Sequence, residues 1–370
     1  MSKILYVATV VKNHIMEFHV PYLKMLKEMG WETAVAAKND YDNKGECVIP
    51  YCDTFYDIPF ERNPFRFDNI KAYKELKQII DKGEYDIIHC HTPVGALITR
   101  LAAQDARKKG TRVFYTAHGF HFYKGAPLIN WIVYYSAEKY LARKTDVLIT
   151  ITKEDYQRAK KFNAKHVEYI PGVGIDLNHY KRDNLELAKQ LKSDLGIPAS
   201  ATVLLSVGEV NANKNHKLII QALQDFPDAW FVLCGQGPLI QEYRKLADDL
   251  GVGDRVIMTG YRTDVINFYR MADIFILPSL REGLPVALME AMSMGLVCVA
   301  SRNRGTDELL RGSRLLFSAT SVKELKEKLM IAMKEDCSDE VKRNSLHLKD
   351  FDLSNTLKSM KTLYQQEVLH

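Results

Sequence analysis

Hydrophobic and polar positions along the first half of the chain follow two different patterns. Short apolar runs of β-branched and aromatic residues, typical of buried parallel strands, alternate with stretches whose apolar residues recur at helical spacing. The short runs predict strands at residues 4–11, 32–37, 85–91, 112–117, 147–151 and 167–170. The helical stretches predict helices at 19–29, 68–81, 95–109, 129–143 and 154–162. Strands that alternate with helices predict a doubly wound parallel sheet in an α/β fold, which binds ligands at the carboxyl ends of its strands.

The second half of the chain repeats this pattern without repeating the sequence. Apolar runs predict strands at residues 203–207, 230–234, 256–258, 274–277, 297–300 and 314–316, with helices between them. A polar stretch at 171–200, which contains a helix-like segment at 185–195, joins the two halves. We therefore expect two Rossmann-like domains, residues 1–180 and 181–352. The last segment, 353–370, is amphipathic, and we expect it to form a helix.

Composition narrows the class of protein. The chain has 370 residues, 46% of them hydrophobic and 26% charged, which suits two globular domains with full cores. Its net charge of +5 arises in residues 1–180 and is too small to predict nucleic-acid binding, but it suits weak attraction to an anionic membrane surface. The six cysteines are scattered without a C-x-x-C pair, which favours a reducing compartment over a disulfide frame. We expect neither a signal peptide nor a membrane-spanning helix, and hence a cytoplasmic protein.

The stretch 277–295, LPSLREGLPVALMEAMSMG, carries the strongest chemical signal. It predicts a strand, a short loop and a helix, with Glu282 in the loop and Glu290 inside the helix. Between them Gly283, Leu284 and Pro285 lead into Val286, so that backbone N–H groups at the helix start can hold an anion. The two carboxylates are spaced to hold the two ends of a nucleotide-sugar. The plainer alternative is an ordinary strand–loop–helix with one solvated glutamate and one glutamate paired with an arginine.

In this context the spacing resembles the C-terminal signature of the GT4 family of retaining glycosyltransferases, and the resemblance extends over nearly the whole chain. It implies the GT-B architecture, in which two Rossmann-like domains face one cleft and the last helix crosses back to the first domain. It also implies that Glu282 orients the donor sugar and that Glu290 holds the ribose. The helix start at 283–286 and Lys214 would stabilise the leaving diphosphate, a donor-phosphate oxygen would act as base, and neither a cofactor nor a metal would be required.

Histidines follow three of the predicted strands in the first half. His14 stands where the family usually has a Gly-Gly pair, and it is a candidate phosphate ligand or a loop-lining residue. His118, in TAHGFHF, matches the family histidine that contacts the donor sugar, whereas we expect a structural role for His121. His89 and His91 lie on one face of a strand, which suggests a metal site. Because no third ligand is evident nearby, a metal site is disfavoured, and a satisfied loop histidine or a wall of the acceptor pocket is the favoured interpretation.

Three loops of the second half resemble the family's nucleotide-binding loops. Lys214 matches the lysine of the diphosphate clamp, but Glu209 stands where the family usually has arginine. Arg262, Arg281 or His14 are candidates to replace that arginine. The loop at Gly235 resembles the glycine loop beside the nucleotide, and the segment formed by Gly260, Tyr261 and Arg262 resembles the segment that meets the base. A purely turn-forming role is an equal alternative for both loops.

The resemblance is closest to bacterial capsule and exopolysaccharide transferases. It implies a UDP-sugar donor, often an N-acetylhexosamine, and a polyprenyl-diphosphate-linked saccharide acceptor at the inner face of the cell membrane. It also implies association with other polysaccharide-synthesis proteins. The aromatic segment 130–135, followed by Lys139, Arg143 and Lys144, is a candidate membrane contact, although a core helix is favoured. Two alternatives remain: a UDP-N-acetylhexosamine epimerase of the same fold, and a non-catalytic subunit that binds nucleotide-sugar.

Overall fold

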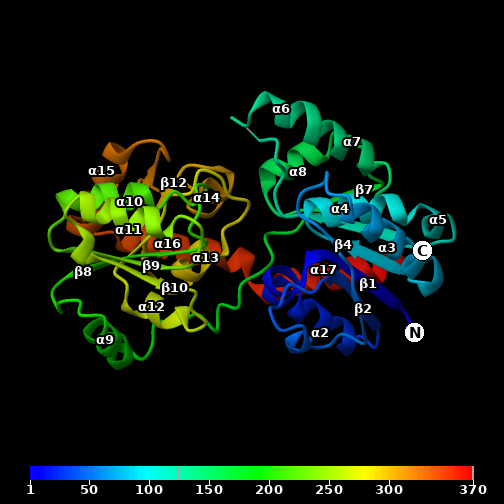
Figure 1. Cartoon of the computed structure of the whole chain (residues 1–370), viewed down its shortest axis with the longest axis horizontal. Coiled ribbons are helices and arrows are strands. Elements are labelled where there is room, and N and C mark those ends of the chain that lie inside the picture. Colours follow the sequence, from blue (N-terminus) through cyan, green and yellow to red (C-terminus); the bar gives the residue numbers. More distant parts are fainter. Residues whose placement is uncertain (124, 369–370) are drawn as a thin grey trace. The chain divides into compact units, whose positions relative to one another are not determined.

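The computed structural model describes residues 1–123 and 125–368, which divide into two compact units (Figure 1). The first unit contains residues 1–174 together with the segment that starts at Leu353, and the second contains residues 175–352. Residues 175–180 therefore pack with the second unit, whereas the sequence pattern placed the boundary after 180. Each unit is built around its own parallel sheet.

The first unit contains a seven-stranded parallel sheet with the strand order β3-β2-β1-β4-β5-β6-β7. Its strands are β1 (Lys3–Val10), β2 (Glu32–Lys38), β3 (Thr54–Asp57), β4 (Ile87–Cys90), β5 (Arg112–Ala117), β6 (Val147–Thr150) and β7 (His166–Tyr169). Its helices are α1 (Met16–Phe18), α2 (Val20–Glu28), α3 (Asp68–Gly83), α4 (Pro93–Ala102), α5 (Gln104–Lys108), α6 (Leu128–Asn130), α7 (Ser136–Ala142) and α8 (Lys153–Ala159). Two π-helical segments, η1 (Val11–Ile15) and η3 (Trp131–Tyr135), and one 3₁₀ turn, η2 (Lys44–Glu46), complete it.

Alternate residues of β1 show how the two faces of this sheet are covered. Leu5 and Val7 are fully buried in the apolar layer that α3 and α4 cover. Ile4 and Tyr6 are fully buried in the opposite layer, under α2 and the C-terminal helix α17 (Leu353–Val368). Because side chains alternate along a strand, a central strand that is covered on both faces must be apolar throughout. The apolar run at 4–11 meets this requirement.

The second unit contains a six-stranded parallel sheet with the strand order β10-β9-β8-β11-β12-β13. Its strands are β8 (Thr202–Val207), β9 (Ala229–Cys234), β10 (Val256–Gly260), β11 (Ile274–Leu277), β12 (Val297–Ser301) and β13 (Leu316–Phe317). Its helices are α9 (Leu185–Asp194), α10 (Lys217–Ala222), α11 (Ile240–Asp249), α12 (Val265–Met271), α13 (Val286–Ser293), α14 (Arg304–Leu309), α15 (Val322–Lys334) and α16 (Ser338–Leu348). Its 3₁₀ turns are η4 (Leu223–Asp225), η5 (Gly253–Arg255) and η6 (Lys349–Phe351). The predicted α/β class, with two doubly wound parallel sheets, is confirmed.

The C-terminal helix α17 belongs to the first unit, as predicted. Its Tyr364 is fully buried and lies 2.6 Å from both the hydroxyl of Tyr6 and the Nδ1 of His89. Met360, one turn earlier, is buried in the same layer. The last helix thus supplies part of the core beneath the first sheet.

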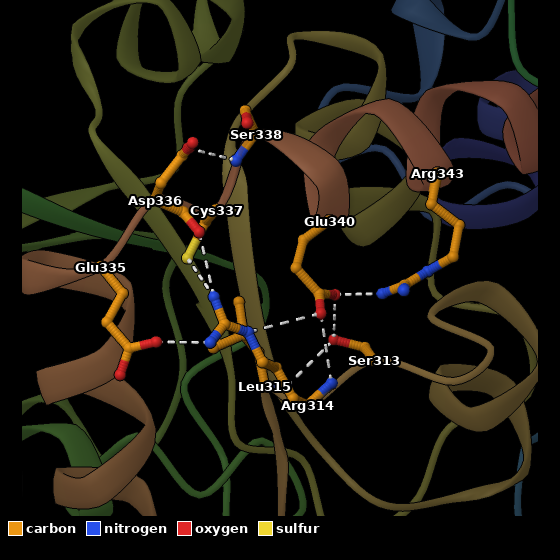
Figure 2. Close-up of polar contacts among 9 residues, drawn as sticks. All are labelled: Ser313, Arg314, Leu315, Glu335, Asp336, Cys337, Ser338, Glu340 and Arg343. Atoms are coloured by element: carbon orange, nitrogen blue, oxygen red, sulfur yellow. Dashed lines mark hydrogen bonds and ion pairs between the residues drawn. The ribbon is translucent and has the colours of Figure 1, made fainter.

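Figure 2 shows a polar network around a buried carboxylate that ties the segment before β13 to α16 and to the link between α15 and α16. Glu340 accepts a hydrogen bond from the hydroxyl of Ser313 at 2.8 Å and also pairs with Arg343. Arg314 pairs with Glu335 and donates to the carbonyl of Asp336 at 3.0 Å. A buried carboxylate is tolerated when hydrogen bonds and a cation compensate its charge, so we interpret this network as structural.

The observed elements differ from the predicted ones at one strand and two helices. The short edge strand β3 was not predicted, because its sequence TFYD is half-exposed and carries no apolar run. The single helix predicted at 95–109 is broken at Ala103 into α4 and α5. The helix predicted at 129–143 is divided into α6, the π-helical segment η3 and α7.

The interpretation of 130–135 as part of a core helix is wrong. Ile132, Val133 and Tyr134 expose 59%, 45% and 39% of their surface, and Leu128 and Ile129 just before them expose 74% and 60%. Only part of this segment packs inward, through the half-buried Trp131 and Tyr135. Apolar periodicity alone cannot distinguish a helix that is covered by the protein from one that leaves apolar side chains in contact with solvent.

Candidate functional site

The predicted strand–loop–helix around Glu282 forms at the carboxyl end of β11, in the middle of the second sheet. Helix α13 begins at Val286, and Pro285 occupies the N-cap position, one residue earlier than expected. The first-turn N–H groups of a helix have no intrahelical partners, so this start can bind an anion. Helix α14 presses closely on the same loop, because a Cβ on Gly305 would lie 2.0 Å from the carbonyl oxygen of Gly283. Only glycine fits at that contact.

The structure brings together Lys214 and Glu282, two of the residues predicted to be catalytic. The Nζ of Lys214 lies 2.7 Å from Oε1 of Glu282, and only 20% and 12% of the two side chains are exposed. Lys214 comes from the loop after β8, which is tied to the loop after β11: the N–H of Leu280 donates to the carbonyl of Asn213 at 2.8 Å. Each charge compensates the other at the start of α13. An anionic ligand at this helix start would therefore meet a lysine that is already in place.

The carboxylate of Glu290 is held at both oxygens. The hydroxyl of Tyr180 donates to Oε1 at 2.6 Å, and the hydroxyl of Tyr269 donates to Oε2 at 2.7 Å. Burial raises the pKa of Tyr269 well above its ordinary value, and the nearby Glu290 raises it further, so the phenol keeps its proton and remains a donor. Each carboxylate oxygen retains a further lone pair for a ligand hydroxyl. The two tyrosines were missed at the sequence level, because Tyr269 fits the apolar pattern of α12 and Tyr180 lies in the polar joining stretch.

The glycine loops of the second unit lie next to one another. The N–H of Gly235 donates to the carbonyl of Gly260 at 2.9 Å, and a Cβ on Gly235 would lie 1.9 Å from the carbonyl oxygen of Gly208. Gly235 has φ +159° and Gly260 has φ +74°, so the latter lies in the left-handed region. These contacts bring the loops after β8, β9 and β10 together at one edge of the sheet. The close approach at Gly235 explains why a side chain is excluded there.

The remaining residues predicted to contact the nucleotide differ in their exposure and in their contacts. Tyr261 is 57% exposed, whereas Arg262 makes a two-point contact with Asp264, through Nε at 2.8 Å and Nη2 at 2.7 Å. Glu209 and Arg281 are exposed at the surface. The guanidinium of Arg262 would have to leave Asp264 or share it in order to replace the clamp arginine that is missing at Glu209.

In the first unit, four histidines converge where β1, β4 and β5 end. The Nε2 of His14 lies 3.2 Å from the Nε2 of His19, and the Nδ1 of His91 lies 3.3 Å from the Nε2 of His118. One candidate ligand atom from each of the four rings lies within 4.8 Å of the others. The argument that no third ligand lies near His91 is therefore wrong. It failed because His14 and His19 follow a different strand and are brought in by the sheet order.

Burial keeps these histidines neutral. It lowers the pKa of His118 to about 4 and the pKa values of His14, His19 and His91 well below their ordinary value, and for the latter three the neighbouring imidazoles lower them further. His89 is distinct from this group, because its Nδ1 contacts Tyr364 at 2.6 Å and its Nε2 contacts Thr116 at 2.8 Å. His121 stacks on the ring of Tyr134 at 4.9 Å between centroids.

A pocket of about 480 Å³ opens beside His14 in the first unit. One part of its wall is polar, with His14 and Arg62. The larger part is apolar and includes Phe65, Val133 and Leu141. Val133 also belongs to the exposed apolar segment 128–134, so the pocket wall continues into that surface. Such a pocket suits an amphipathic ligand with a polar head and an apolar portion.

Comparisons with known proteins agree with these features. Residues 3–152 match the family model "Glycosyl transferase 4-like", and residues 188–346 match "Glycosyl transferases group 1". The chain is 40% identical over 316 residues to "Putative glycosyltransferase EpsD" of Bacillus subtilis (strain 168), which covers 84% of this chain and 81% of the relative. The chain belongs to the GT4 glycosyltransferase family.

Two further comparisons extend this assignment. The chain is 29% identical to the UDP-Gal:α-D-GlcNAc-diphosphoundecaprenol α-1,3-galactosyltransferase of Escherichia coli, over 68% of this chain and 66% of that one. Its fold matches the crystal structure of Anabaena HepE in complex with UDP and glucose, with a TM-score of 0.80 over 99% of this chain and 100% of the other, at 18% identity. The two Rossmann-like units with a returning C-terminal helix are the GT-B architecture. Within residues 1–123 and 125–368, the structure has no helix that is long and apolar enough to cross a membrane.

Proposed function

We propose that this glycosyltransferase moves a sugar, an N-acetylhexosamine, from a UDP-sugar to a polyprenyl-diphosphate-linked saccharide in exopolysaccharide or capsule biosynthesis. The UDP-sugar donor is supported mainly by the arrangement around α13, where a lysine, two carboxylates and a helix start occur together. The relative in Escherichia coli is named for a UDP-sugar donor and a diphosphoundecaprenol acceptor. The similarity to EpsD supports an exopolysaccharide role.

In the proposed donor site, the start of α13 at 283–286 and Lys214 hold the diphosphate. Glu290, fixed by its two tyrosines, accepts the hydroxyls of the ribose, and the loops at Gly235 and at Gly260 to Arg262 border the nucleotide. Glu282 orients the sugar hydroxyls, and His118 and His14 complete the set of donor ligands. The ion pair of Lys214 with Glu282 supports this proposal, because it holds the proposed phosphate ligand beside the proposed sugar ligand.

Transfer proceeds with retention at the anomeric carbon. The acceptor hydroxyl attacks on the face from which the nucleoside diphosphate leaves, and the bond between the anomeric carbon and the phosphate oxygen breaks. The diphosphate takes the electron pair of that bond, and a donor-phosphate oxygen takes the proton of the acceptor. Lys214 and the first-turn N–H groups of α13 stabilise the developing negative charge, which in a closed site contributes about 3 kcal/mol per well-placed donor. In this mechanism no metal takes part in the transfer step.

The acceptor half of the proposal rests on the first unit. Its pocket of about 480 Å³ combines a polar wall with an apolar one, which suits a lipid-linked saccharide. The exposed apolar side chains at 128–134 and the lysine and arginine residues that follow them suit a membrane with anionic headgroups. We infer peripheral attachment to the inner face of the cell membrane through this unit.

The test is a transfer assay with UDP-sugars and synthetic polyprenyl-diphosphate saccharides, in which UDP release and the glycolipid product are both followed. We expect product only when donor and acceptor are both present, with no loss of rate after treatment with EDTA. Loss of the product in Glu282→Gln would support the assignment. An altered sugar formed from the donor alone would instead identify an epimerase. Donor binding without transfer to any acceptor would identify a non-catalytic subunit, and either result would overturn the proposal.

A first measurement of the donor class is a thermal-shift screen with UDP-, GDP- and ADP-sugars on the native chain and on Glu290→Ala. Ligand at 100 times its Kd stabilises a protein by about 2.7 kcal/mol, which raises the melting temperature by several degrees. A shift with UDP-sugars that disappears in the variant would support the ribose assignment. The same shift in both proteins would remove Glu290 from the site.

A further inference from the structure

Four histidines in the first unit come from separate segments of the chain and present nitrogen atoms to one another. His14 belongs to the π-helical segment after β1, His19 precedes α2, His91 follows β4, and His118 follows β5. The atoms that could act as ligands all lie within 4.8 Å of one another. The fold thus gathers at one point four side chains that are separated by up to about a hundred positions in the sequence.

The distances between these nitrogens fit a small tetrahedral metal site. In such sites Zn–N bonds measure about 2.0–2.1 Å, which places neighbouring ligand nitrogens about 3.3 Å apart. The pair His14–His19 is separated by 3.2 Å and the pair His91–His118 by 3.3 Å. Two edges of the required tetrahedron are therefore already present. The other edges need only small side-chain shifts, because no two of the four atoms are further apart than 4.8 Å.

The protonation state of the rings suits a cation. Burial lowers the pKa of all four histidines, so at neutral pH each ring carries a lone pair rather than a positive charge. In addition, the Nε2 of His91 is buried and has no hydrogen-bond partner within the described part of the chain. A buried polar atom without a partner costs about 1–3 kcal/mol, so hydrogen bonds between the rings do not satisfy the cluster.

We propose that His14, His19, His91 and His118 bind one divalent transition-metal cation of the zinc class. Imidazole ligands favour Zn²⁺, Co²⁺, Ni²⁺ and Cu²⁺, whereas Mg²⁺ and Ca²⁺ prefer oxygen ligands. His89 is not part of the set, because both of its nitrogens already have partners. The positive charge of Arg62 lowers the pKa of His14, and it would also repel a bound cation. We therefore expect the metal affinity of this site to be below that of thiolate zinc sites.

The site has a functional consequence that rests on the proposed function. His14 and His118 are also assigned to the donor sugar and phosphate, and a nitrogen bound to a metal cannot make those contacts. Metal binding and donor contact therefore exclude each other at these two side chains. We expect the cation to inhibit transfer reversibly, which agrees with a transfer step in which no metal participates.

Cobalt provides the direct test, because tetrahedral Co²⁺ bound to imidazole absorbs visible light. The full chain is first stripped with a chelator and then titrated with Co²⁺, and Zn²⁺ is used to displace it. We expect one Co²⁺ per chain in the native protein and none in His19→Gln or His91→Gln. The matched control is His216→Gln, which changes a buried histidine of the second unit and should leave binding intact. Circular dichroism of each variant verifies folding.

The outcomes separate this inference from the proposed function. No cobalt band in the native chain, or an undiminished band in folded His19→Gln and folded His91→Gln, would overturn the metal site while leaving the transfer assay unaffected. If both variants fail to fold, single changes at His14 and His118 are tested against the same criterion. Zinc inhibition of transfer should be strong in the native enzyme and at least 10-fold weaker in His19→Gln. Metal binding by a chain without transferase activity would support the site and contradict the proposed function.

Discussion

Lys214 and Glu282 form an ion pair at 2.7 Å although 68 positions separate them in the sequence. The contact joins the loop after β8 to the loop after β11, and it lies beside the start of α13. Within this pair the two charges compensate one another. A diphosphate that binds at the helix start would attract the lysine, and the carboxylate would become available to a sugar hydroxyl. The pair thus links the phosphate and sugar ends of the proposed donor.

Replacement of Lys214 tests the charge stabilisation directly. We expect Lys214→Ala to lower kcat/KM by about 100-fold, because it removes a cation worth about 3 kcal/mol to the leaving diphosphate. The measurement is steady-state UDP release with acceptor present. Lys217→Ala is the matched control, since Lys217 lies three residues further along the chain and is exposed at the start of α10. Equal rates in native protein and Lys214→Ala would exclude this lysine from the diphosphate site.

The tyrosines that hold Glu290 should act as positioning residues. Tyr269→Phe and Tyr180→Phe each remove one charge-assisted hydrogen bond to the carboxylate, and we expect KM for the donor to rise about 10-fold with a smaller change in kcat. The informative readout is discrimination between UDP and 2′-deoxy-UDP as inhibitors. It should shrink in both variants, whereas the exposed Tyr140→Phe should leave it unchanged. Discrimination that is retained in Tyr269→Phe and Tyr180→Phe would mean that Glu290 does not hold the ribose.

The exposed apolar segment of the first unit predicts lipid binding. We expect Leu128, Ile129 and Ile132, changed together to serine, to reduce co-sedimentation with anionic vesicles at low salt by at least 5-fold, because the side chains that would enter the interface are removed. Leu346→Ser is a control, since Leu346 is 56% exposed on the second unit. Absence of vesicle binding by the native chain would contradict peripheral attachment.

His216 predicts a pH effect on stability. It is fully buried, and burial lowers its pKa to about 3, with the nearby Lys214 lowering it further. In the unfolded chain a histidine has a pKa near 6.5, so between pH 6.5 and about 3 the unfolded state binds a proton that the folded state does not. This difference destabilises the folded state as pH falls, by about 2 kcal/mol between pH 6.5 and 4.5.

The variant His216→Asn should therefore lose about 2 kcal/mol less free energy of unfolding over that pH range than the native chain does. Urea unfolding at pH 6.5 and at pH 4.5 measures the difference. His166→Asn is the control, because the side chain of His166 is about half-exposed. Identical losses in the native protein and in His216→Asn would show that His216 is protonated without cost in the folded state.

The sequence predicted the sheets well because parallel strands that are covered on both faces must be apolar throughout. The apolar runs around β1, β8 and β11 are typical of strands that are buried on both faces. It predicted less well where the backbone departs from regular structure. The division of 128–142 into α-, π- and α-helical segments leaves no mark in apolar periodicity. Nor does periodicity reveal that side chains such as Ile132 are left exposed.

The site shows the same division between local and long-range information. Glu282, the helix start at Val286 and Glu290 lie within nine positions of each other, so one stretch of sequence predicts their arrangement. Tyr180 reaches Glu290 across 110 positions, and the group around His91 depends on the order of three strands. Such contacts follow from the topology of the sheet, which the spacing of residues along the chain does not encode.

The return of α17 to the first sheet has a consequence for the order of synthesis. In the sequence, the residues of the second unit come between the two parts of the first unit. All of them therefore leave the ribosome before Tyr364 does. Until then the face of the first sheet that carries Tyr6 lacks the helix α17 that covers it, and Tyr6 and His89 lack their shared partner, Tyr364. The sheet that begins to form first during translation is thus the last to be completed, and it stays open to chaperones for as long as the second unit is being made.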